Sequence, residues 1–128
     1  MAYKSAYKFI YKTLNLGLKR TGVFVNSTAG YPRVEVHSFV ENQALDKGAA
    51  VRVISCIVES MSTTSLENAV EMNEKNIELI QAIGQVSGAA FKIVGFIPTT
   101  LQDLVEQTDT QSILYRQLQS YDIYLEQQ

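Results

Sequence analysis

The chain has 128 residues, of which 46% are hydrophobic and 19% are charged, so it has the length and apolar content of one domain with its own core. Its single cysteine, Cys56, excludes an internal disulfide and suits a reducing compartment. No stretch approaches the roughly 18 apolar residues of a membrane-spanning helix, and the basic N-terminus lacks the apolar segment of a signal peptide. We therefore expect an intracellular product without membrane contact.

The formal net charge of −2 hides an uneven distribution. Residues 1–20 carry 5 of the 11 basic residues and no acidic residue, whereas the remaining 6 basic residues are set against all 13 acidic ones. A basic segment on an acidic body is compatible with binding to nucleic acid, to a membrane surface or to the acidic body of an identical neighbour. The five charges are too few for the nucleic-acid and membrane interpretations to prevail.

Residues 2–18 are predicted to form an amphipathic helix. Tyrosine and lysine repeat side by side every four residues, at Tyr3, Tyr7, Tyr11, Lys4, Lys8 and Lys12. Three interpretations of this face are open. The lysines contact phosphates while the tyrosines stack on bases, or the face is a protein interface, or the tyrosines are half-buried against a sheet beside solvated lysines.

Three strands are predicted next, over 23–25, 31–40 and 50–61, with a polar hairpin loop over 41–49. The second strand alternates between an apolar face with Val34, Val36 and Val40 and a polar face with Arg33, Glu35 and His37. Both faces of the third strand are largely apolar.

A long amphipathic helix should follow the third strand. Thr64 and Glu67 have the spacing of a capping box, in which the Thr64 hydroxyl accepts from the Glu67 backbone and the Glu67 carboxylate reaches back. The helix should extend to about Ile83 and end at Gly84.

Residues 89–97 should form a fourth strand that ends at Pro98. Residues 98–112 are predicted to be a long polar connection with one helical turn, and connections of this length are usually functional or mobile. The final strand covers 113–126, and a change in its apolar parity requires a bulge near Gln119.

The element order α-β-β-β-α-β-β predicts an α+β fold with residues 1–128 in a single domain. We expect one mixed, mostly antiparallel sheet of four to five strands with two helices packed on it.

Few residues carry chemistry. The lone His37 is expected on the surface and Cys56 in the core, because neither has the companions that a zinc site or an activated nucleophile needs. The Ser/Thr run at 60–65 is explained by helix capping without a phosphate ligand. We therefore expect no enzyme activity, no metal and no cofactor.

Five segments in order carry a family resemblance: the opening helix 3–18, the short strand 23–25, the Tyr-Pro entry at 31–36, the strand 51–58 with its Ser/Thr-capped helix at 62–69, and the closing strand 115–125 with Arg116. In this order and spacing the chain resembles the tail terminator (tail completion) proteins of long-tailed bacteriophages. The resemblance covers nearly the whole chain.

The resemblance implies a structural virion protein. It implies that copies pack side by side into a ring, hexameric in the family, which caps the tail tube, stops its growth and joins it to the neck. The implied partners are the protein itself, the tail tube protein and a neck or head-completion protein, with no membrane and no sequence-specific nucleic acid. The implied location is the tail or neck of a virion assembled in the host cytoplasm.

In such a ring, the basic helix of one copy is expected to face an acidic patch of the next copy. The candidate subunit interface comprises Tyr3, Lys4, Tyr7, Lys8, Lys12, Glu67, Glu71, Glu74 and Glu78. The candidate contacts to the tube or neck lie in the two long connections, at Glu41, Asp46, Lys47, Leu101, Asp103 and Glu106. Unpaired strand edges that extend a sheet across subunits are an alternative interface.

Two other classes of function are open. One is a neck or head-closure (head–tail connector) protein of the same kind of particle. The other is a small nucleic-acid-binding accessory protein that uses the basic helix, in which case its affinity for nucleic acid falls steeply with salt.

Overall fold

The computed structural model describes residues 2–19, 24–26, 30–42, 51–88, 90–108 and 112–127. Its elements follow in the order α1 (Ala2–Leu18), β1 (Phe24–Val25), β2 (Arg33–Asn42), β3 (Val51–Ser62), α2 (Leu66–Ile83), β4 (Val86–Ser87), β5 (Phe91–Gln107) and β6 (Ile113–Gln127). They form one six-stranded sheet in the order β1-β2-β3-β6-β5-β4. Strand β1 is parallel to β2, and the other neighbouring pairs are antiparallel. The predicted α+β class is confirmed, and β4 is an additional short strand.

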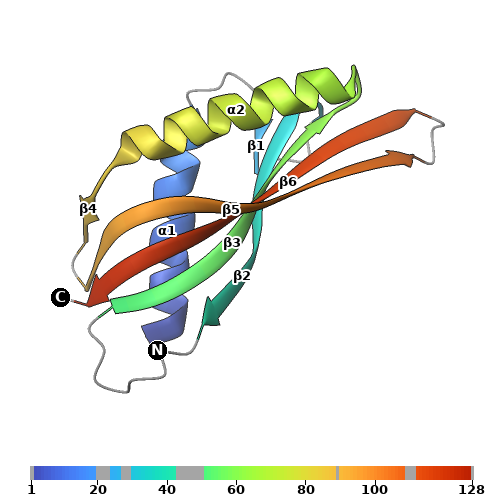
Figure 1. Ribbon diagram of the computed structural model, residues 1–128. Coiled ribbons are helices and arrows are strands. Elements are labelled where there is room, and N and C mark those ends of the chain that lie inside the picture. Colours follow the sequence, from blue (N-terminus) through green and yellow to red (C-terminus); the bar gives the residue numbers. More distant parts are fainter. Residues whose placement is uncertain are drawn as a thin grey trace.

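Both helices pack on one face of the sheet and enclose the core between themselves and the strands (Figure 1). The core is built mainly from α1, β3 and β6, through Ile10, Leu14, Ile54, Val58, Tyr121, Ile123 and Leu125. Cys56 is buried among them, as predicted. Because burial of one such aliphatic side chain contributes about 1.5–3 kcal/mol, this single layer between helices and sheet dominates the stability of the fold.

The start of α2 is capped one residue later than predicted. The Asn68 backbone N–H donates to the Ser65 hydroxyl at 3.0 Å, and the Ser62 hydroxyl donates to the Asn68 side-chain oxygen at 2.6 Å. Thr64 is exposed, so the predicted Thr64–Glu67 capping box is wrong, although the Ser/Thr run does cap the helix. Of these two serines, Ser65 accepts from a free N–H of the helix, whereas Ser62, the last residue of β3, holds the Asn68 side chain.

A bulge in β2 overturns part of its predicted pattern. The register against β3 shifts between His37 and Val40, and Ser38 has a φ of 60°. The shift turns Phe39 toward α1, where its ring stacks on Tyr7 with the centroids 5.6 Å apart. Val40 is consequently 57% exposed and does not join the buried face that was predicted for it.

Strand β5 continues far beyond its predicted end at Pro98 and pairs with β6 as far as Gln107. The predicted connection over 98–112, with its helical turn, is therefore wrong. Pro98 is tolerated because it lies at a register shift, where a strand does not need every backbone N–H.

Strand β6 pairs with β3 without a break, so the predicted bulge near Gln119 is wrong. The apolar parity changes because Gln117 and Gln119 lie buried on the same face as Tyr121. Each amide nitrogen donates a hydrogen bond, although the buried Gln117 Oε1 has no partner among the described residues. Gln119 accepts from the Asn73 side-chain amide at 3.2 Å and donates to the Thr100 carbonyl at 3.2 Å.

Candidate assembly interface

The outer part of the β5–β6 hairpin, residues 98–107 and 113–117, is here called the arm. It projects past the start of α2 at the right of Figure 1, and β3 pairs only with its residues 115–117. Four of its apolar side chains are exposed, namely Leu101, Leu104, Val105 and Ile113. The predicted contact residues Leu101, Asp103 and Glu106 therefore lie on a regular strand of a projecting hairpin, not in a loop.

Polar contacts between its two strands hold the arm together. The Arg116 guanidinium contacts the Glu106 carboxylate at 3.0 Å, and the Gln117 amide donates to the Asp103 carboxylate. An isolated two-stranded ribbon is only marginally stable in water. These contacts and the continuation of both strands into the sheet make the arm an ordered surface.

A buried glutamate ties the arm to the centre of the sheet. Glu59 of β3 is only 1% exposed, and its carboxylate pairs with Arg116 of the arm and with His37 Nε2 of β2 at 2.8 Å. Burial alone would raise the pKa of Glu59, but the hydrogen bonds and charges of Arg116 and His37 outweigh it and lower the pKa. The bond to Glu59 in turn raises the pKa of Arg116.

Sequence reasoning missed this cluster. The sequence predicts a surface His37, but in the structure His37 is half-buried and its Nε2 is hydrogen-bonded to Glu59. The sequence signal for Glu59 is the only acidic residue of a largely apolar strand, and its partners are brought together only by strand pairing across β2, β3 and β6.

The outer surface of α1 is basic. The rings of Tyr7 and Tyr11 pack on Phe39, with the centroids 5.6 and 6.4 Å away, whereas Lys8 and Lys12 are exposed. Of the three interpretations of this helix face, the half-buried tyrosine beside solvated lysines describes Tyr7, whereas Tyr11 contacts Phe39 but is 38% exposed.

The outer surface of α2 is acidic. Glu67, Glu71, Glu74 and Glu78 are all exposed at helical spacing. Glu78 lies 3.8 Å from Lys75, an exposed pair of small energetic weight. The helix thus presents a row of carboxylates to solvent.

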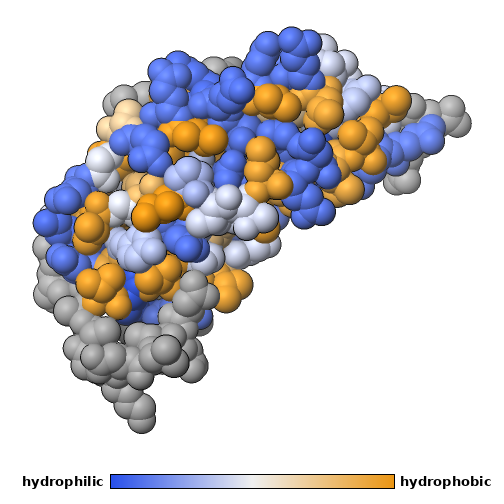
Figure 2. Space-filling model, in the orientation of Figure 1, coloured by the Kyte–Doolittle hydropathy of each residue, from blue (hydrophilic) through white to orange (hydrophobic). Residues whose placement is uncertain are grey.

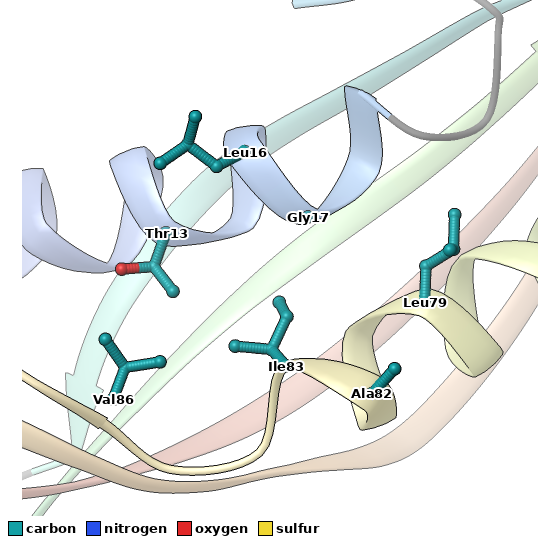
Figure 3. A pocket seen from close by; sticks show the side chains of 7 residues that line it. All are labelled: Thr13, Leu16, Gly17, Leu79, Ala82, Ile83 and Val86. Atoms are coloured by element: carbon teal, nitrogen blue, oxygen red, sulfur yellow. The ribbon is translucent and has the colours of Figure 1, made fainter.

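An apolar groove of about 320 Å³ lies between α1, α2 and β4 (Figure 3). It is lined by Thr13, Leu16, Gly17, Leu79, Ala82, Ile83 and Val86. A Cβ at Gly17 would lie 2.7 Å from Ile83 Cδ1, so the absence of a side chain there permits the close approach of the two helices. Leu16, at the rim, is 60% exposed.

The face of the sheet that turns away from α1 has no helix on it and is directed toward the viewer in Figure 1. Figure 2 shows apolar side chains scattered among polar ones over this face. The exposed apolar residues on it include Val40, Val51 and Ile97. The second apolar side of β3 belongs to this open face.

The other predicted contact residues have varied positions. Glu41 forms a two-point ion pair with Arg52, at 2.5 and 2.8 Å, and so is already satisfied within the molecule. Asp46, Lys47 and the side chains of Tyr3 and Lys4 lie outside the described residues.

The described residues offer little reactive chemistry. No group of three His, Cys, Asp or Glu side chains among them is placed to hold a metal ion, and no helix among them is long and apolar enough to cross a membrane. Burial raises the pKa of Cys56 to about 12, so its thiol stays protonated at neutral pH.

No protein-family model matches the sequence, and no curated protein matches it. The fold is similar to that of a chain in the virion of a native gene transfer agent (GTA) particle, with a TM-score of 0.66 over 91% of both chains. The two sequences are 14% identical, so the similarity establishes a shared fold and does not transfer individual residues.

Proposed function

We propose that the protein is a structural component of a virion and, more specifically, a tail terminator that caps the tail tube. The observation that supports the virion role is the fold shared over 91% of the chain with a chain of the GTA virion. The finer role is supported by the order of sequence segments that resembles the tail terminator family. A fold hosts many functions, so the surfaces of the chain must supply the mechanism.

The charges of the two helices suit a head-to-tail contact between copies. Lys8 and Lys12 extend from α1, the glutamate row extends from α2, and within the described residues no ion pair joins the two helices. A contact between α1 of one copy and α2 of the next would pair these charges. Such a contact uses two different patches, and it closes into a ring when the rotation between copies allows.

A closed ring stops a tube from growing because it occupies the surface to which the next tube subunit would add. We propose a hexamer, in line with the family resemblance, with one rim on the tail tube protein and the other on a neck or head-completion protein. Glu41, Asp46 and Lys47, around the β2–β3 connection, are proposed to contact one of these two partners.

A tube-growth assay tests this proposal. Tail tube protein of the same particle is polymerised, the protein is added, more tube protein follows, and tube lengths are measured by negative-stain electron microscopy. We expect growth to stop and a ring to appear at one tube end.

Unchanged growth with bare tube ends would overturn the terminator role, and binding to a portal-side ring without any effect on tubes would identify a head-closure protein instead. The double variant Lys8→Glu with Lys12→Glu is the matched control, because it should fold normally and cap poorly.

A further inference from the structure

We infer that the arm of one copy docks into the α1–α2–β4 groove of the next copy. The inference deepens the proposed function and rests on it, because it identifies the surfaces through which the copies of the ring meet. It assigns Leu101, Asp103 and Glu106 to the subunit contact and not to the tube.

The arm has the composition of an inserted element. Its four exposed apolar side chains lie on two paired strands, and the most exposed of them is Val105, at 52%. Neither helix covers the outer part of the hairpin (Figure 1). Because exposed apolar area is unfavourable in water, a projecting ribbon of this kind gains most when another surface covers it.

The groove has the matching properties. Most of its lining residues are aliphatic, and Figure 3 shows Ile83 and Val86 directed toward Thr13 of α1. The exposed rim residue Leu16 widens the apolar surface beyond the groove itself. The face of the arm with Leu101, Val105 and Ile113 presents side chains of a size that fits such a depression.

The positions of the two surfaces favour a second copy as the occupant. In Figure 1 the arm extends to the right, whereas the C-terminal half of α2 and β4, which border the groove, lie at the left. Two complementary surfaces at opposite sides of one molecule form a heterologous interface, the type that produces rings.

The surrounding charges agree with this orientation. The arm carries Asp103 and Glu106, and the adjacent start of α2 carries Glu67 and Glu71. Exposed Lys12 and Lys19 flank the α1 side of the groove, and exposed Glu78 lies next to Leu79 on its α2 side. Docking therefore brings the acidic arm onto the basic α1 side of the groove.

Site-specific cross-linking tests the contact. Two variants are prepared, Leu16→Cys in the groove rim and Val105→Cys in the arm, and one of them carries an affinity tag. Both positions are exposed, so both variants should fold, which circular dichroism checks. The native Cys56 is buried and need not be removed. A short bismaleimide is used because it tolerates a wider spacing than a disulfide.

We expect a mixed dimer from the two variants together, and little dimer from either variant alone. The matched control replaces Val105→Cys with Val40→Cys, which is equally exposed but lies on the open face of the sheet. A mixed dimer several-fold above this control supports the contact. A yield no higher than the control overturns it, and strong dimers from one variant alone would also overturn it, because they indicate a symmetric contact.

A second pair of variants separates this inference from the proposed function. Leu16→Asp destroys the groove and keeps the arm, whereas Val105→Asp destroys the arm and keeps the groove. Each alone should fail to form rings, and a mixture should yield a dimer that cannot grow, as measured by mass photometry. If both variants still form rings and cap tubes, the arm–groove contact is wrong and the terminator role stands. If the mixed dimer forms but tubes are never capped, the contact stands and the terminator role fails.

Discussion

The two halves of β6 belong to one strand and have opposite surroundings. In the inner half, Tyr121, Ile123 and Leu125 are fully buried beneath the helices. In the outer half, Gln117 and Gln119 are buried beside Leu114, whereas Ile113 is exposed. One hairpin thus serves two purposes. Its inner half builds the core, and its outer half leaves several apolar side chains on the surface, where a partner can cover them.

Truncating one side chain in each half tests most directly whether the inner half stabilises the fold and the outer half does not. Ile123→Ala removes a fully buried side chain and should lower the free energy of unfolding by about 2–5 kcal/mol. Val105→Ala in the arm should change it by no more than about 0.5 kcal/mol, because the side chain is mostly in water. Urea denaturation of both variants measures the difference, and equal losses would contradict the division between core and arm.

Glu59 of β3 ties the arm to β2 through Arg116 and His37, so its removal should have the next largest effect. Glu59→Gln removes the buried carboxylate partner of Arg116 and should cost about 1.5–3 kcal/mol, the range for hydrogen bonds to charged groups. The matched control is Glu106→Gln, which removes the other, largely exposed partner of Arg116 and should cost less than about 1 kcal/mol. Similar costs for the two variants would show that the buried pair has no special weight.

The same glutamate predicts a pH dependence. The folded-state pKa of Glu59 lies below the ordinary value of 4.5, so its ionised form stabilises the fold above that pH. This contribution should be lost as the pH falls below 4.5 and through the folded-state pKa. The stability difference between wild type and Glu59→Gln should therefore shrink in acid, and a difference that stays constant from neutral pH to pH 3 or below would contradict it.

Charge reversal on α1 should weaken association between copies without unfolding any of them. Lys8→Glu with Lys12→Glu should reduce self-association about tenfold at low salt and less at high salt. The compensating change Glu71→Lys with Glu74→Lys should restore it, as measured by sedimentation velocity on the mixed pair. Failure of the compensating variant to restore association would remove α2 from the interface.

The smallest effect concerns the start of α2, next to the base of the arm, where Ser62 pairs with Tyr115. Ser65→Ala should cost about 1 kcal/mol through loss of the N-cap. Thr64→Ala, one residue earlier and exposed, should cost almost nothing. Thermal unfolding of the two variants distinguishes the observed cap from the capping box that the sequence predicts.

The parts of the fold that sequence predicts well are those with a strong local period. The spacing of Ile10, Leu14 and Leu18 determines α1, and the end of α2 at Gly84 follows from its positive φ of 67°. These features depend on contacts along one element. They could therefore be predicted without knowledge of the partners in the sheet.

The arm could not be predicted in this way. A proline normally ends a strand and glutamines are normally exposed, yet a register shift accommodates Pro98, and the amide nitrogens of Gln117 and Gln119 donate hydrogen bonds in their buried positions. The Glu59 cluster was missed for the same reason, because its members come from three strands. Sequence named Leu101, Asp103 and Glu106 as contact residues but placed them in a loop.

Localisation in native particles tests the central claim most directly. Cryo-electron microscopy of whole virions, with antibody labelling of this chain, should show a closed ring of its copies at the head-proximal end of the tail tube. Label found only on the head shell, or absent from the particle, would contradict the account.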